Sequence, residues 1–207
     1  VLWKLCTVGK NTGNQKLSRK EGDSCTGRMG TKASAFRLPI DRVFSLKGFG
    51  TVVTGTLLDD SLGLNYDTML YPRAERVKIR GIQVHGQEVS EAVPGQRVAV
   101  NLPGIEKEHI SRGEILAAAG SMEGTMIADV RLQLLKSGQR SLKSGTRVHL
   151  YHGAAELVCK IILFDRVVLK PGEEAIVQLR MEQVTAMKAG DHFVIRFYSP
   201  VETIGGG

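Results

Sequence analysis

Short runs of β-forming residues, separated by turn signals, follow one another from Phe36 to the end of the chain, and this pattern constrains the fold most. Strand-sized runs bounded by Gly, Pro, Asn or Asp are typical of antiparallel β structure. Runs so closely spaced favour small barrels, because closing a sheet on itself removes its exposed edges. The runs expected in the first half are 36–44, 51–58, 68–71, 76–85, 97–102 and 115–117, with a helical turn at 106–111.

A second series of β runs begins near Thr125. Its members are 126–135, 147–152, 155–169, 175–181 and 192–198. The segment 120–124, with a glycine at each end, separates the two series. The sequence therefore predicts an all-β chain of two successive antiparallel β-barrels, at residues 36–120 and 125–207.

Residues 1–35 differ from the rest of the chain. They contain seven Lys/Arg and two Asp/Glu, and residues 9–35 offer almost no apolar anchors. Such a composition cannot offset the entropy of an ordered chain, so we predict a disordered or atypical leader. The chain opens on Val1 rather than on methionine, which fits a fragment of a longer protein.

Charge, cysteine and histidine content argue against several classes of function. The net charge is +7, but residues 36–207 hold 21 Lys/Arg against 19 Asp/Glu, so nucleic-acid contacts there must come from local patches. Three cysteines without CxxC spacing predict neither disulfides nor a zinc site, and Cys159 is expected to be buried. His149 and His152 should face opposite sides of a strand, so no metal site is expected. No apolar run is long enough for a membrane span, and the predicted location is cytoplasmic.

The most distinctive motif lies in residues 36–58, where Asp41-Arg42 interrupts a β run and 47–50 (Lys-Gly-Phe-Gly) turn the chain into the next one. This stretch resembles the opening of domain II in translational GTPases of the elongation factor Tu class. Residues 40–44 (Ile-Asp-Arg-Val-Phe) resemble the selenocysteine-specific, SelB-type member. The tail 198–207 is similar to the end of domain III in SelB-type factors. The resemblance covers residues 36–207 and implies one domain II-like and one domain III-like barrel.

The resemblance also implies a function and partners. SelB-type factors bind selenocysteinyl-tRNA and deliver it to the ribosome at UGA codons, and their domain II holds the aminoacyl end. GTP and Mg would be bound by a GTPase domain, and the selenocysteine-insertion element of the mRNA by C-terminal domains, neither of which is expected in this chain. Gly9-Lys10-Asn11 lacks the GxxxxGK[ST] spacing of a phosphate loop, so the chain is expected neither to bind nor to hydrolyse GTP.

Asp41, Arg42 and Arg97 are the candidate binding residues. Charged residues within β runs commonly face solvent or form an ion pair at the rim of a barrel. The resemblance implies instead that these three grip the selenocysteinyl group. Because neighbours on a regular strand face opposite sides, Asp41 and Arg42 can share a pocket only at a bulge or a strand end. The resemblance also brings Gly48 and Gly50 near the 3′ end of the tRNA, although glycines there first serve the turn.

The chemistry of a selenol suits two arginines. A selenol ionises below neutral pH, whereas the hydroxyl of a seryl group stays neutral. Guanidinium groups stay charged, hold their donors in a fixed fork and favour an anion through charge-assisted hydrogen bonds. Asp41 is expected to orient one of them. Two alternatives remain open: a fragment of a general translational GTPase, such as elongation factor Tu or an initiation factor, and a standalone β-barrel interaction module.

Overall fold

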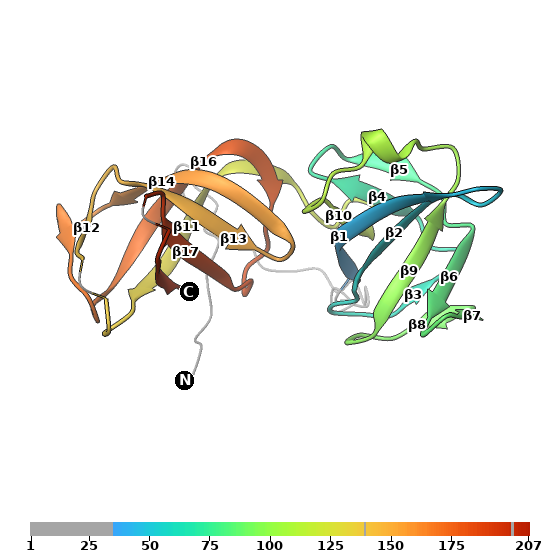
Figure 1. Cartoon of the computed structure of the whole chain (residues 1–207), viewed down its shortest axis with the longest axis horizontal. Helices are drawn as coiled ribbons and strands as arrows, with labels where there is room; N and C mark the ends of the chain where they lie inside the picture. Colours follow the sequence, from blue (N-terminus) through green and yellow to red (C-terminus); the bar gives the residue numbers. More distant parts are fainter. Residues whose placement is uncertain (1–34, 139, 200) are drawn as a thin grey trace, which may run out of the picture.

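The computed structural model describes residues 35–138, 140–199 and 201–207, and their regular secondary structure is almost entirely β-strand (Figure 1). The prediction of an all-β fold is confirmed. The leader predicted for residues 1–35 lies outside the described residues, apart from Ala35. Within the described residues, no helix has the length and apolar character needed to cross a membrane, and no group of three or more His, Cys, Asp or Glu could hold a metal ion.

The first ten strands and a 3₁₀ turn form one unit. Their bounds are β1 (Arg37–Leu46), β2 (Gly50–Thr56), β3 (Leu62–Gly63), β4 (Thr68–Tyr71), β5 (Glu75–Val77), β6 (Gly81–Val84), β7 (Gln87–Val89), β8 (Glu91–Ala92), β9 (Arg97–Leu102), η1 (Lys107–His109) and β10 (Ile115–Ala118). Eight of these strands form one sheet in the order β5-β4-β10-β1-β2-β9-β6-β7, and β3 pairs with β8. We call the whole unit, including β3 and β8, the eight-stranded sheet after its main sheet.

The eight-stranded sheet curls around a single core. Alternate residues of each strand point inward, as in Leu38 and Ile40 of β1 or Val98 and Val100 of β9, and all four are essentially buried. Period-two alternation of this kind is what places one face of each strand in the core. No ladder joins β5 to β7 within the described residues, so hydrogen bonds do not close this sheet.

The remaining strands form a closed barrel in the order β11-β16-β14-β13-β17-β18, with a small hairpin of β12 and β15. Their bounds are β11 (Gly124–Leu134), β12 (Leu142–Lys143), β13 (Arg147–His152), β14 (Ala155–Leu163), β15 (Val168–Leu169), β16 (Glu174–Ala186), β17 (Phe193–Phe197) and β18 (Thr203–Gly206). The barrel closes where Gln133 and Leu134 of β11 pair with Gly206 and Gly205 of β18. Cys159 lies fully inside it, as predicted, and burial raises the pKa of its thiol to about 12.

A small apolar cluster joins the two units. Tyr71, Ile115 and Ala117, on the outer side of the eight-stranded sheet, pack with Met122 of the connecting segment and Ala186 at the end of β16. In Figure 1, β1 and β10 lie on the side of the sheet that faces the closed barrel. The outer face of β1 and β10 is therefore partly covered by the second unit.

A buried ion cluster lies between the same two units. Arg37 donates through Nε to Asp59, 2.6 Å away, and through Nη1 to Oδ1 of Asp191, 2.7 Å away. His152 Nε2 lies 2.9 Å from Oδ2 of Asp191, which also accepts the backbone N–H of Lys188. An ionised carboxylate only accepts hydrogen bonds, so Nε2 of His152 must carry the proton. The side chains of Arg37 and Asp191 are only 10% and 8% exposed, so this charge pair is almost completely desolvated.

Because of Asp191, we expect the ion cluster to contribute less to the stability of the fold in acid than at neutral pH. Burial raises the pKa of this carboxyl, but the hydrogen bonds from His152, the Lys188 amide and Arg37 outweigh it and lower the pKa to about 2. A depressed pKa contributes stability that is present above the unfolded value, about 4, and is lost as the pH falls towards about 2. The contribution near neutral pH is on the order of 2 kcal/mol.

Urea unfolding of the wild type and Asp191→Asn should show this. We expect the variant to be less stable near neutral pH, with the difference shrinking below about pH 4. Asp165→Asn, which removes an exposed carboxylate of the same barrel, is the control and should change little. A stability difference for Asp191→Asn that does not change with pH would contradict this role.

Candidate functional site

The outer face of the eight-stranded sheet carries the candidate residues. On β2 and β9 the inward residues fill the core, so Thr54, Arg97 and Asn101 belong to the opposite face. The register places Thr54 opposite Ala99 and Val52 opposite Asn101. This face is continuous across β1, β2, β9 and β6.

A β-bulge brings Asp41 and Arg42 to the same side of β1. The pairing runs from Ile40 opposite Gly55 directly to Arg42 opposite Thr54, so Asp41 is the extra residue. In a bulge, two residues of one strand oppose one of its partner, and the usual alternation of faces is interrupted. Gly55 permits the close approach, because a Cβ there would collide with the carbonyl oxygen of Pro39. Asp41 and Arg42 thus lie at a bulge, which the sequence analysis required if both side chains were to face one pocket.

Asp41 and Arg97 form a two-pronged ion pair across three strands. Arg97 donates through Nη1 to Oδ2 of Asp41 and through Nη2 to Oδ1, the latter over 2.8 Å. Thr54 donates to the same Oδ1 over 3.0 Å. Partial burial raises the pKa of Asp41, but the hydrogen bonds from Arg97 and Thr54 outweigh it, and the pKa lies below its ordinary value. Asp41 is therefore a carboxylate at neutral pH.

Arg42 lies next to this pair without joining it. The side chain is exposed and makes no hydrogen bond or ion pair with any described residue, although its charge helps to lower the pKa of Asp41. The three side chains together carry two positive charges and one negative charge. An arrangement of this kind retains an uncompensated cation, which can bind an anionic group by charge-assisted hydrogen bonds.

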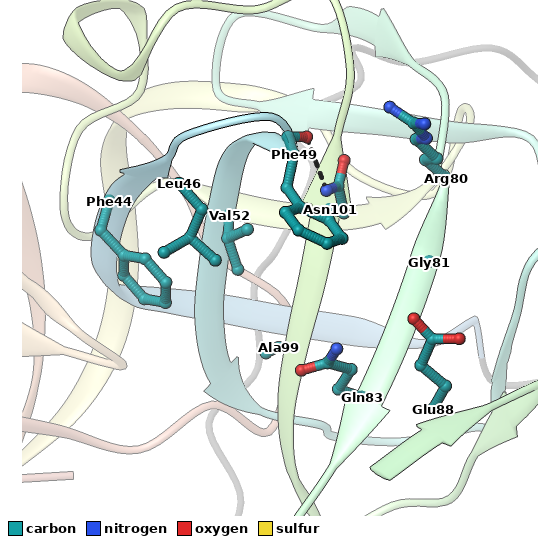
Figure 2. A pocket seen from close by; sticks show the side chains of 10 residues that line it. All are labelled: Phe44, Leu46, Phe49, Val52, Arg80, Gly81, Gln83, Glu88, Ala99 and Asn101. Carbon is teal, nitrogen blue, oxygen red and sulfur yellow. Dashed lines mark hydrogen bonds between the residues drawn. The ribbon is translucent and has the colours of Figure 1, made fainter. Parts of the chain in front are cut away.

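An apolar pocket of about 290 Å³ opens on the same face (Figure 2). Phe44, Leu46, Phe49 and Val52 form one side of it, Asn101 lies beside Phe49, and the polar side chains Arg80, Gln83 and Glu88 border the other side. Figure 2 shows the Asn101 amide nitrogen directed at the backbone oxygen of Phe49, to which it donates over 2.7 Å. The Oδ1 atom of Asn101 is buried and has no hydrogen-bond partner among the described residues. The pocket thus combines aromatic and aliphatic side chains with polar groups at its border.

Gly48 and Gly50 form the tip of the β1–β2 hairpin beside this pocket. Both have positive φ, +85° and +86°, which only glycine adopts readily. Neither lines the pocket, which is lined instead by their neighbours Leu46 and Phe49. These glycines therefore shape the turn that supports the apolar side of the pocket.

A second hollow, of about 200 Å³, lies beside Arg97. Thr54, His85 and Arg97 border it, while Gln83 and Ala99 border both hollows. Arg97 therefore borders a hollow that adjoins the apolar pocket at Gln83 and Ala99. A ligand with an anionic end and a flat or apolar body fits this succession of surfaces.

Comparison with known proteins decides the family. Residues 129–207 match the family described as the β-barrel domain of the selenocysteine-specific elongation factor. A selenocysteine-specific elongation factor from Desulfomicrobium baculatum is 41% identical over 176 residues, which cover 85% of this chain and 28% of that protein. The chain belongs to the selenocysteine-specific elongation factors.

Two further relatives extend the comparison. A selenocysteine-specific elongation factor from Methanocaldococcus jannaschii is 31% identical over 76% of this chain and 33% of its own length. Elongation factor Tu 2 of Streptomyces avermitilis is 27% identical over 83% of this chain and 45% of its own length. The chain spans less than half of each of these proteins, so the activities of a complete selenocysteine-specific elongation factor enter below as proposals.

Sequence reasoning missed several residues of this face. Thr54 and Asn101 read as ordinary strand residues, yet one holds Asp41 and the other borders the pocket. The alternation of β9 was a usable signal, because Asn101 stands four residues after Arg97 and must share its face. Gln83 and His85 were harder to place, since the run predicted at 76–85 is broken: β5 ends at Val77 and β6 begins at Gly81.

The closed barrel of this family member carries a row of cations that sequence reasoning also missed. Arg147 of β13 lies opposite Lys160 of β14, which in turn lies opposite Arg180 of β16. Like charges directly opposite each other destabilise a sheet. Among the ion pairs of the described residues, Arg147 is the only member of this row that takes part in one, with Glu182 at 2.6 Å. No linear motif reveals the row, because its members come from three strands.

Proposed function

We propose that this chain holds the aminoacyl end of selenocysteinyl-tRNA for a selenocysteine-specific elongation factor that delivers it to the ribosome at UGA codons. The observation that carries the proposal is the bulge that gathers Asp41 and Arg42 beside Arg97, with one net positive charge. The names and identities of the relatives support it.

A selenolate matches the charge of this cluster. Arg42 forms no hydrogen bond or ion pair with a described residue, so an incoming anion does not need to displace an ion pair to reach it. Asp41 holds Arg97 in place through two hydrogen bonds and keeps the unliganded site from carrying two unpaired cations. A neutral seryl group offers no charge to either arginine, and the site would discriminate against it by leaving a cation uncompensated.

The apolar pocket suits the terminal nucleoside of the tRNA. Phe44, Phe49 and Val52 provide surfaces on which a base can pack, and the polar side chains Gln83 and Asn101 at the border of the pocket can form hydrogen bonds with a nucleoside. The second hollow, which Arg97 borders, shares Gln83 and Ala99 with this pocket, so a nucleoside in the pocket would direct its aminoacyl group towards the arginines.

Other functions of a complete factor belong to the regions of the longer relatives that this chain does not cover. GTP and Mg would be bound by the GTPase part of the factor, and the selenocysteine-insertion element of the mRNA by further parts. The alternative of a general translational GTPase is disfavoured by the Asp41-Arg42 and Arg97 cluster. The alternative of a standalone interaction module is disfavoured by the relatives described above, all of which are named as elongation factors.

The test compares three aminoacyl groups. A complete factor that contains this chain is titrated with selenocysteinyl-, seryl- and cysteinyl-tRNA at one salt concentration, since phosphate contacts depend on salt. Preference for the selenocysteinyl form supports the proposal. Equal affinities for the three would support a general translational factor, and no binding to any of them would support the interaction module.

The cation row of the closed barrel predicts a contact with the phosphate backbone of the tRNA. Replacing Lys160 with alanine should weaken binding of all aminoacyl forms equally and reduce the slope of log affinity against log salt by about 0.9 for each phosphate that is no longer neutralised. The fold should not be weakened, because the substitution relieves repulsion from Arg147 and Arg180. Lys143→Ala on β12 is the control; the same slope for both variants would contradict the contact.

A further inference from the structure

The bulge that carries the candidate site lies where β1 changes partners. Residues 37–39 of β1 pair with β10, and residues 40–46 pair with β2. Asp41 is the second residue after this change of partner and has no pairing partner of its own in the register. The direction of its side chain depends on how the preceding segment of β1 is held.

The closed barrel contacts the structure immediately beside this point. The turn after β13 approaches Pro39: a Cβ on Gly153 would lie 3.4 Å from the Cβ of Pro39. The same turn approaches Gly113, where a Cβ would lie 2.6 Å from the Cα of Ala155. Gly113 donates its N–H to the carbonyl oxygen of Ile40, over 2.8 Å. One contact thus involves Pro39, two residues before Asp41, and the other involves Gly113, which is hydrogen-bonded to Ile40.

The buried ion cluster fixes the same strand from its other end. Arg37 precedes Pro39 by two residues on the outer face of β1, and its side chain is bound to Asp191 of the closed barrel. Asp191 is in turn held by His152, the residue that begins the turn 152–155. The ion cluster and the turn are therefore parts of one contact surface, and that surface contacts β1 from Arg37 to Pro39.

We propose that the closed barrel positions the Asp41–Arg42 bulge, with Arg37, Asp191 and the turn 152–155 as positioning elements, so that the anion site is correctly formed only when the two units are packed together. These residues do not touch a ligand bound at the arginines. Their effect on ligand binding rests on the proposed function, whereas their effect on the geometry of the bulge does not.

A wedge between the two units tests this directly. In Gly113→Ala the new methyl group collides with the backbone of Ala155 and pushes the turn away from β1. Gly104→Ala is the matched control, because Gly104 also has a positive φ, +79°, but has open space around its Cβ position. Asp191→Asn weakens the same contact surface without adding a heavy atom to it. This variant replaces Gly113→Ala in the test if Gly113→Ala does not fold.

The readout is the pKa of Asp41, measured by NMR on the whole chain. The hydrogen bonds from Arg97 and Thr54 lower this pKa, with the charges of Arg97 and Arg42 contributing, so a displaced bulge raises it towards its ordinary value. We expect a rise in Gly113→Ala and Asp191→Asn and none in Gly104→Ala. Loss of overall stability alone does not move the pKa of a carboxyl in the folded state.

The outcomes separate this inference from the proposed function. An unchanged pKa of Asp41 in both Gly113→Ala and Asp191→Asn overturns the inference, whatever happens to tRNA binding. A raised pKa together with weaker binding of selenocysteinyl-tRNA to the complete factor supports both ideas. A raised pKa with unchanged binding supports the positioning role and contradicts the proposed function of the arginines.

Discussion

Replacing Arg97 with alanine in a complete factor is expected to weaken selenocysteinyl-tRNA binding roughly ten- to a hundredfold. Loss of a charge-assisted hydrogen bond to a partly desolvated anion costs on the order of 1.5–3 kcal/mol. The substitution also frees Asp41, whose carboxylate then repels the selenolate, and it removes the net positive charge of the cluster. Seryl-tRNA binding should change little, because the neutral hydroxyl never depended on that charge.

Companion variants identify which property of Arg97 matters. Arg97→Lys keeps the charge but loses the planar fork that holds both oxygens of Asp41, so it should give an intermediate loss. Asp41→Asn should act more mildly than Arg97→Ala, because it disorders an arginine without removing a cation. Arg42→Ala should resemble Arg97→Ala. A competition assay with both charged tRNAs separates these cases, and equal losses for both tRNAs would assign the arginines to the fold or to the tRNA backbone.

Replacing Arg37 with alanine should have the largest effect on stability. The substitution leaves Asp191 and Asp59 without their shared cation in a site where Arg37 and Asp191 are nearly inaccessible to water. Removing one partner of a buried ion pair typically costs about 3–5 kcal/mol. Arg76→Ala is the control, since its pair with Asp67 is exposed and such pairs contribute about 0–1 kcal/mol.

Urea unfolding of both variants measures the difference. We expect a much lower midpoint for Arg37→Ala than for Arg76→Ala. The transition should also separate into two steps if the two units come apart and unfold independently. Similar midpoints for the two variants would show that the ion cluster contributes no more than a surface pair and would also weaken the case for barrel-dependent positioning.

Most strands could be predicted because β runs with period-two alternation carry their own signal. β4 (Thr68–Tyr71), β9 (Arg97–Leu102) and β13 (Arg147–His152) have the predicted bounds. The short strands β3, β7, β8 and β12 were not predicted, and two further differences have tertiary causes. The run 155–169 ends early because Phe164–Val167 turns away from the barrel to pair β15 with β12. β18 was not predicted as a strand, since its glycines have low β propensity and are required only by close contact with the backbone of β11 and β17.

The candidate site could be predicted in part. The residue types and the need for a bulge followed from the sequence, but the bulge itself depends on the register between β1 and β2. The pairing of Asp41 with Arg97, 56 positions apart, also depends on that register. The contact of Pro39 and Gly113 with the closed barrel has no sequence signal at all, because it arises from the packing of one unit on another. The predicted boundary at 120–124 stays a prediction; β10 ends at Ala118 and β11 begins at Gly124.

The central claim is that the arginine cluster binds an ionised selenol. The measurement that tests it most directly is the ratio of selenocysteinyl-tRNA to seryl-tRNA affinity in a complete factor, followed from slightly alkaline to acidic pH at fixed salt. Changes in tRNA backbone contacts cancel in this ratio. The pKa of Asp41 lies below its ordinary value, and Arg97→Ala retains Asp41, so a change in the ratio that Arg97→Ala lacks reports on the selenol and its arginine.

The expected result is a ratio that falls as the selenol becomes protonated in the wild type and stays nearly constant in Arg97→Ala. A ratio that is independent of pH in the wild type would show that the arginines do not recognise a selenolate, and it would contradict this account of the site.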